Sequence, residues 1–247
     1  MNNHKFLLAL VLLVSMTLTG CFIDVNDDDG LFGCIDADGP ITTADLELDD
    51  FDGIALAMDA QIEITQGPEQ LVTFEGKSDI LDELDLDVDN GVWTIRTVDC
   101  VRDVDDLTFF ITVPDLDKII LSGSGDIVST NTFVNAGDVE LSISGSGEID
   151  VAYEADDIEA TISGSGKITI EGLADDLDLS ISGSGDYRGF NLFTNSADIS
   201  IAGSGDAEVQ VADRLEVSIA GSGDVFYKGQ PELDVTISGS GEVIDAN

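Results

Sequence analysis

Residues 141–150 read LSISGSGEID, and variants of this stretch recur through the second half of the chain. The tripeptide Gly-Ser-Gly occurs seven times, at residues 123–125, 145–147, 164–166, 183–185, 203–205, 221–223 and 239–241. Successive copies start 18 to 22 residues apart, and alternating aliphatic residues precede each one. A period near 19 residues with strand-type alternation inside it predicts a repeat architecture.

A repeat this short cannot enclose a core alone, so neighbouring coils must bury their aliphatic residues against one another. The sequence therefore predicts an all-β fold, a right-handed parallel β-helix (solenoid) with coils of about 18–20 residues. The side chains expected to point inward include Leu141, Ile143, Ile162, Leu179, Ile181, Ile201, Val217, Ile219, Val235 and Ile237.

The glycines of the tripeptide have a structural explanation, since a sharp corner in every coil needs positive φ or very close backbone approach. The Ser between them could form a ladder of hydrogen bonds along the stack. The glycines to which we assign this role are Gly123, Gly125, Gly145, Gly147, Gly164, Gly166, Gly183, Gly185, Gly203, Gly205, Gly221, Gly223, Gly239 and Gly241.

The chain begins with a secretory leader. Residues 1–20 have a short basic start and an unbroken apolar run from Phe6 to Val14, too short to span a membrane. Leu18-Thr19-Gly20-Cys21 follows directly and matches a bacterial lipobox, in which Cys21 is lipidated. We expect a lipid anchor in the cell envelope. In a Gram-negative host, Phe22 gives no inner-membrane retention signal, so the expected location is the outer membrane.

Residues 21–40 are rich in Asp and Gly and are expected to form a tether, followed by a single β-helix domain over 41–247. Apart from Cys21, the exported chain keeps Cys34 and Cys100. An even pair in an oxidising compartment predicts a disulfide between Cys34 and Cys100.

Residues 41–115 contain strand-type alternation without Gly-Ser-Gly and are expected to form less regular N-terminal coils. Asn90-Gly91 before Val92 is a hairpin signal, and residues 79–84 could form one helical turn. The regular repeat coils are expected over 116–247.

Several motifs resemble those of a bacterial family, the auto-transporter adhesin head domain, also called the GIN domain. The resemblance covers about residues 45–245 and is carried by Phe51-Asp52-Gly53-Ile54, by IEITQG at 62–67, by Val113-Pro114-Asp115-Leu116, and by SGSGD at 122–126. It implies a β-helix in a cell-envelope protein. It supplies no catalytic residues.

Charge and composition exclude several classes of function. The chain has 51 Asp and Glu against 9 Lys and Arg, and Lys5 lies in the leader. This balance argues against nucleic acids and anionic lipid headgroups as partners. His4, the only histidine, also lies in the leader, which excludes Ser-His-Asp, Cys-His and His-ligated zinc sites from the exported protein. An enzyme that acts on polysaccharides through carboxylates is the third hypothesis, after an adhesive or structural binding module and a Ca²⁺-dependent surface module.

The residues that follow Gly-Ser-Gly form a candidate cation site. Six of the seven are acidic, and Lys167 is the exception. In-register coils would stack these side chains about 4.8 Å apart, where like charges repel and Ca²⁺ could relieve them. A solvated acidic ridge explains the same pattern without a metal. The acidic residues are Asp126, Glu148, Asp186, Asp206, Asp224 and Glu242.

A rigid solenoid on a lipid tether suits a non-enzymatic adhesive or structural module. No cofactor is expected, and Ca²⁺ enters only in the alternative of a Ca²⁺-dependent surface module. The expected partners are the membrane, through the lipid at Cys21, and an envelope or extracellular ligand. Because little sequence follows Gly241 to cap the last coil, self-association through the C-terminal coil is also expected.

Overall fold

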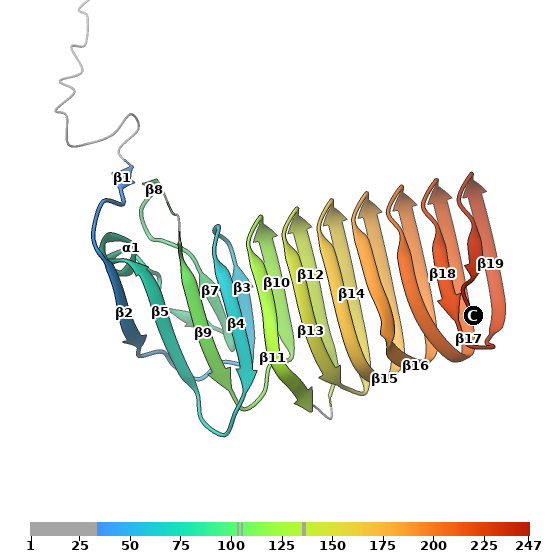
Figure 1. Ribbon diagram of the computed structural model, residues 1–247, viewed down its shortest axis with the longest axis horizontal. Helices are drawn as coiled ribbons and strands as arrows, with labels where there is room; N and C mark the ends of the chain where they lie inside the picture. Colours follow the sequence, from blue (N-terminus) through green and yellow to red (C-terminus); the bar gives the residue numbers. More distant parts are fainter. Residues whose placement is uncertain (1–33, 103, 105, 135–136) are drawn as a thin grey trace, which may run out of the picture.

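The computed structural model describes residues 34–102, 104, 106–134 and 137–247. These residues form a β-solenoid with one short helix (Figure 1). The strands of successive coils stack along two opposite faces of the solenoid, which we call the first and the second sheet. The hydrophobic core lies between these two faces. The predicted all-β solenoid is confirmed.

In the repeat coils, the first sheet contains the strands that end at Gly-Ser-Gly corners, and two strands of the N-terminal coils extend it without such a corner. All its pairings along the stack are parallel. The strands that belong to this sheet alone are β7 (Val92–Ile95), β3 (Gly53–Leu56), β10 (Lys118–Gly123), β12 (Val139–Gly145), β14 (Asp157–Gly164) and β19 (Glu232–Gly239). Three longer strands bend around the opposite corner and serve both sheets, namely β15 (Lys167–Gly183), β16 (Asp186–Gly203) and β17 (Ala207–Gly221).

In the repeat coils, the strands of the second sheet begin after each Gly-Ser-Gly corner. This sheet is completed by β9 (Thr108–Val113), β4 (Gln61–Gln66), β11 (Asp126–Val134), β13 (Glu148–Glu154), β18 (Val225–Lys228) and β20 (Val243–Asp245). These strands also pair in parallel, so a coil of about 19 residues returns to the same place in the stack. The repeat length in the sequence is therefore the length of one coil.

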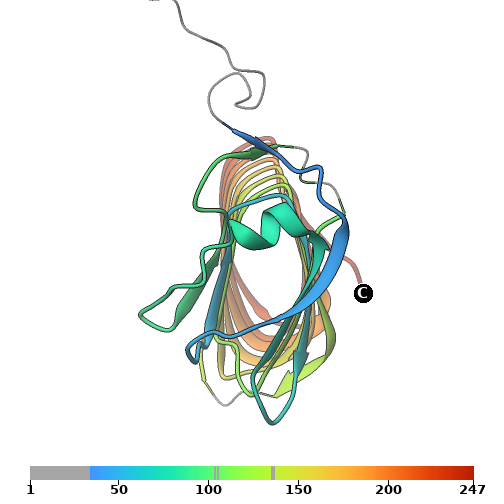
Figure 2. The same cartoon turned by 90° about the vertical axis from the view of Figure 1, so that its left-hand side faces the viewer.

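Antiparallel strands close the N-terminal end of the solenoid. Here β5 (Leu71–Lys77) pairs antiparallel with β9 on one side and with β2 (Ile41–Leu46) on the other. The helix α1 (Ser78–Asp82) follows β5 and lies across this end, with Ile80 fully buried (Figure 2). Residues 41–115 thus combine parallel coil strands with an antiparallel cover.

Two short elements complete the N-terminal part. The hairpin predicted at Asn90-Gly91 joins β6 (Val88–Asp89) to β7, and both turn residues have positive φ. The strand β1 (Ile35–Asp36) pairs with β8 (Val101–Arg102) beside the Cys34–Cys100 disulfide. Aromatic residues fill the core at this end, where the Trp93 ring lies 5.9 Å from Phe51 and 5.7 Å from Phe109.

Eight of the ten aliphatic residues predicted to point inward are at most 2% exposed, as in the case of Ile143 and Leu179. The other two, Val235 and Ile237, are 39% and 41% exposed. Both lie on β19, in register with buried Val217 and Ile219 of β17. They point inward, but β19 is the last described strand of its sheet, so no further coil covers them.

Candidate functional site

The Gly-Ser-Gly corners hold the coils in register, and the two glycines act in different ways. Gly145 has a φ of 146°, a conformation that side chains with a Cβ rarely adopt. Gly147 does not have positive φ, but a Cβ there would lie 2.3 Å from the carbonyl oxygen of Gly125 in the preceding coil. Both explanations expected from the sequence therefore operate, one at each glycine.

The ladder of hydrogen bonds at the corner is formed by backbone rather than by serine hydroxyls. The Ser165 N–H donates to the Gly145 carbonyl at 2.9 Å, and Ser184 and Ser204 repeat this bond to the first glycine of the coil before. One hydroxyl pair, Ser222 and Ser240, lies at hydrogen-bond distance, 3.0 Å. This backbone ladder fixes the side chains that follow each corner.

The residues after Gly-Ser-Gly stack in register, as the sequence analysis expected. Protein groups reduce the repulsion among them. Lys167 forms an ion pair with Glu148 at 2.6 Å. Asp206 Oδ1 accepts the Asp224 N–H at 2.9 Å, and Asp224 Oδ1 accepts the Glu242 N–H at 2.8 Å. Within the described ranges, no three acidic, Cys or His side chains gather closely enough to hold a metal.

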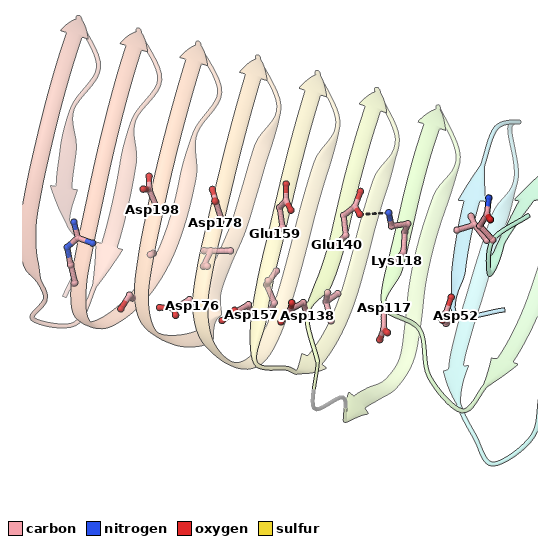
Figure 3. A pocket seen from close by; sticks show the side chains of 18 residues that line it. Asp52, Asp117, Lys118, Asp138, Glu140, Asp157, Glu159, Asp176, Asp178 and Asp198 are labelled. Carbon is pink, nitrogen blue, oxygen red and sulfur yellow. Dashed lines mark ion pairs between the residues drawn. The ribbon is translucent and has the colours of Figure 1, made fainter.

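A second set of acidic residues, which the sequence analysis did not single out, lines a groove on the first sheet. The groove has a volume of about 700 Å³ and runs along the stack from β3 to β17 (Figure 3). We call it the acidic groove. Its polar lining residues are Asp52, Asn90, Asp117, Lys118, Asp138, Glu140, Asp157, Glu159, Asp176, Asp178, Ser196, Asp198 and Arg214.

A column of outward side chains in strict register passes through the acidic groove. It starts at Lys118 on β10, and continuous pairing carries it to Asp234 on β19. Six of the seven positions are acidic. The members of this column are Lys118, Glu140, Glu159, Asp178, Asp198, Glu216 and Asp234.

A second row of acidic side chains lies at the bend opposite the Gly-Ser-Gly corners, where each coil enters the first sheet. Figure 3 shows Asp138, Asp157 and Asp176 side by side there. Asp157 and Asp176 are direct partners in the ladder between β14 and β15. Desolvation raises the pKa of Asp157, and the charges of Asp138, Asp176 and their neighbours raise it further. The groove therefore concentrates negative potential at Asp157.

The two basic residues of the groove, Lys118 on β10 and Arg214 on β17, lie on either side of its central acids. Lys118 pairs with Glu140, and Arg214 pairs with Glu216 at 2.5 Å. Between them, within the described part of the chain, no Lys or Arg lies at ion-pair distance from Glu159, Asp178 or Asp198. A cluster of acids and bases on one face would favour carboxylate catalysis. Among the described residues of the groove, the acids and the two bases do not form such a cluster.

The sequence carries a signal for this groove. Asp138, Asp157 and Asp176 each stand seven residues before the first glycine of a corner, and each is followed two residues later by Glu or Asp. An acid–aliphatic–acid motif at a fixed distance from Gly-Ser-Gly thus repeats in three consecutive coils. Its meaning depends on the coil register, which brings the three motifs together on one face.

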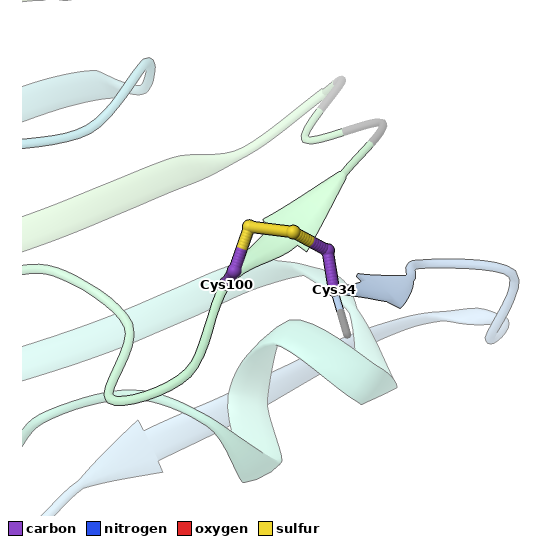
Figure 4. Close-up of a disulfide and its surroundings, with 2 residues drawn as sticks. All are labelled: Cys34 and Cys100. Carbon is purple, nitrogen blue, oxygen red and sulfur yellow. A yellow bond between two sulfur atoms is a disulfide. The ribbon is translucent and has the colours of Figure 1, made fainter. Parts of the chain in front are cut away.

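The remaining predicted site residues concern anchoring. Cys34 and Cys100 form the predicted disulfide, with Cα atoms 4.6 Å apart (Figure 4). The bridge attaches the first described residues to the segment between β7 and β8, and Ala37, just after β1, is buried. Cys21 lies outside the described residues. No helix in the described ranges is both long and apolar enough to cross a membrane.

Comparison with protein families gives a match over residues 50–231 to the family described as "Putative auto-transporter adhesin, head GIN domain". The matched region contains the antiparallel N-terminal cover, except its first strand, and the coils through β18. It includes the whole acidic groove. A comparison with curated proteins finds no match.

Several solved structures share the fold. A "putative adhesin" from Bacteroides fragilis is 22% identical with a TM-score of 0.80, over 85% of this chain and 99% of its own. A "putative lipid binding protein" from Parabacteroides distasonis is also 22% identical, with a TM-score of 0.71 and the same two coverages. A "putative adhesin" from Parabacteroides distasonis is 25% identical with a TM-score of 0.70, over 85% of this chain and 98% of its own.

Proposed function

The chain belongs to the auto-transporter adhesin head, or GIN domain, family, and from this premise we propose that it is a lipid-anchored binding module of the bacterial cell envelope. In this proposal the protein is not an enzyme, and its ligand lies along the acidic groove. The observation that carries the proposal is the continuous column of outward carboxylates, in register over consecutive coils from Glu140 to Asp198.

The groove offers a repeating set of hydrogen-bond acceptors. Two residues beyond the acidic column, each strand presents a hydroxyl, as at Ser142, Thr161 and Ser180, which are also in register. An extended ligand along the solenoid axis would therefore meet a carboxylate and a hydroxyl about every 4.8 Å. Such a surface suits a polymer that carries cations or many hydroxyl donors, and it disfavours a polyanion.

Anchoring through Cys21 supports this role because it would hold the solenoid at a membrane by its N-terminal end. We expect Cys21→Ser to release the protein from the membrane fraction and to abolish labelling with a fatty-acid analogue. Retention of Cys21→Ser in washed membranes would refute the lipid anchor. In a Gram-negative host, the unsubstituted protein should fractionate with the outer membrane.

Adhesion is tested in cells. A strain that lacks the gene should attach less to surfaces coated with polysaccharides or matrix proteins, and the unsubstituted gene should restore attachment. The Cys21→Ser form should not restore it, although the protein is made and folded. Equal attachment of all the strains to every coating would refute the adhesive role.

A Ca²⁺-dependent form of the same module is the alternative. A cation would relieve the repulsion around Asp157, but it would have to complete its coordination with water or the ligand, because no three carboxylates of the described residues gather closely enough to hold it. The column after Gly-Ser-Gly, from Asp126 to Glu242, offers further carboxylates. A ligand that binds only the folded state must raise its stability. A rise in Tm with millimolar Ca²⁺, but not with Mg²⁺ at equal ionic strength, would support this alternative, and no rise would exclude it.

A further inference from the structure

The last described strand of the first sheet leaves one edge unpaired. β19 pairs with β17 along Glu232–Gly239, and within the described ranges no strand pairs with its other edge. All eight of its residues are exposed, including Leu233 at 43%. Leu233, Val235 and Ile237 continue the inward columns of the core, so the apolar interior of the solenoid is open at this end.

The two ends of the solenoid differ in this respect. At the N-terminal end, β2, β5 and α1 cover the core, and Ile80 is fully buried there. At the β19 end, unpaired backbone groups and apolar side chains share one surface. An edge strand of this kind is a template for pairing unless charge, proline or a bulge protects it. Glu232 and Asp234 are the charged residues of β19, and Pro231 precedes it.

We propose that this end docks a second copy of the chain, with two β19 strands pairing antiparallel across a two-fold axis at Val235. Facing residues in an antiparallel pair point to the same side of the sheet. With Val235 facing Val235 of the partner subunit, the side chains of Leu233 and Ile237 also face each other across the junction. The two open cores then close into one.

The same register is favourable for the outward side chains. It sets Asp234 opposite Thr236 and Glu232 opposite Ser238, so each carboxylate faces a hydroxyl rather than another carboxylate. Carboxylates directly opposite each other would destabilise the pairing. This chemical match identifies a second copy as the occupant, because the complementarity arises from the strand itself. An isologous contact of this kind closes at two subunits.

Cysteine cross-linking tests the axis directly. Opposed residues on antiparallel strands have Cα atoms about 4.5–5.5 Å apart, within disulfide range. We expect Val235→Cys in the full-length chain, solubilised from the membrane in detergent, to give a disulfide-linked dimer on mild oxidation. Val217→Cys, the equivalent position one coil earlier, is 1% exposed and should stay monomeric. A monomeric Val235→Cys protein, or equal linking of both variants, would overturn the proposal.

A neighbouring cysteine tests the register. In Thr236→Cys the two sulfur-bearing residues would lie about 8 Å apart across the axis, beyond disulfide reach. Efficient linking at position 236 instead of 235 would overturn the proposed register. Sedimentation of the Cys21→Ser chain gives a second measurement without oxidation. A concentration-dependent dimer that Val235→Asp abolishes at unchanged Tm supports the proposal, and a monomer at all concentrations overturns it.

Discussion

Each Gly-Ser-Gly corner depends on its first glycine for backbone conformation and on its second for close packing. The cost of the backbone conformation and the cost of the close contact can be measured separately. The first Gly-Ser-Gly corner, at Gly123, does not stack on a preceding Gly-Ser-Gly corner, whereas the later corners do. A Cβ on Gly123 would have no heavy atom within 4 Å, whereas one on Gly145 would lie 2.4 Å from the Gly123 carbonyl oxygen. Both residues have similar positive φ, 135° and 146°.

We therefore expect Gly123→Ala to lower the free energy of unfolding by about 1–3 kcal/mol, the usual cost of such a backbone conformation. Gly145→Ala should lower it by a larger amount, because the coils must also move apart. Urea titrations followed by circular dichroism measure both. Equal losses for the two variants would show that the stacking contact contributes nothing.

The two buried tyrosines offer a second comparison. The Tyr153 hydroxyl donates to the Leu116 carbonyl at 2.9 Å, while the Tyr187 hydroxyl is buried with no hydrogen-bond partner among the described residues. Tyr153→Phe should cost about 1–2 kcal/mol, and Tyr187→Phe should be neutral or stabilising. Thermal unfolding of both variants checks this prediction. A larger loss for Tyr187→Phe would imply a partner for its hydroxyl.

At the scale of elements, alternation and repeat length predicted the solenoid and most of its core. The failures have physical causes. Val235 and Ile237 follow the same pattern as Val217 and Ile219, but their burial depends on a neighbouring coil that the pattern does not specify. The antiparallel β2–β5–β9 cover rests on pairings that local alternation does not determine. The acidic groove emerges only when the register is known, since no single coil contains it.

The stacked acids of the groove predict a pH dependence. Because the pKa of Asp157 is raised in the folded protein, its ionised form destabilises the fold, and stability is regained as the pH falls through that pKa. Desolvation and the charge of Asp117 act in the same direction on Asp115. The pKa of Asp85 is lowered by hydrogen bonds from the Asp87 N–H and Arg96, so its stabilisation is lost only below its ordinary value of 3.8.

We expect Tm to rise as the pH falls from 7 towards 4 at constant ionic strength. Asp157→Asn should raise Tm at pH 7 and reduce the gain on acidification. Asp150→Asn, an exposed change outside the groove, is the control. A Tm that falls steadily from pH 7 to pH 4 would contradict this account of the groove.

The disulfide should act on the N-terminal elements rather than on the repeat coils. Cys34 and Cys100 are 66 residues apart, and in the chain-entropy model such a loop stabilises the fold by about 4 kcal/mol. Cys34→Ser with Cys100→Ser should lower stability and remove the hydrogen-exchange protection of β1 and β8. Protection of β14 to β17 should persist. Loss of protection throughout the native protein would show that the coils depend on the bridge.

At the scale of the whole molecule, the solenoid combines a strongly negative surface with two ends that differ in structure. The formal net charge is −42, so salt should stabilise the fold by screening the repulsion between coils. The disulfide-bridged N-terminal end follows the proposed anchor in the sequence, and β19 lies at the far end of the solenoid (Figure 1). Pairing through β19 would direct the two anchored ends away from each other, which suits a link between two surfaces.

The central claim is that the acidic groove is the ligand-binding surface. The most direct measurement compares two variants with equal loss of charge on an array of polysaccharides and matrix proteins. Glu159→Gln, Asp178→Asn and Asp198→Asn change the groove, whereas Glu171→Gln, Asp150→Asn and Asp213→Asn change exposed carboxylates elsewhere. We predict that the first variant loses at least tenfold in affinity for the ligand found with the unsubstituted protein, while the second retains it. Equal affinities of the two variants would contradict the claim.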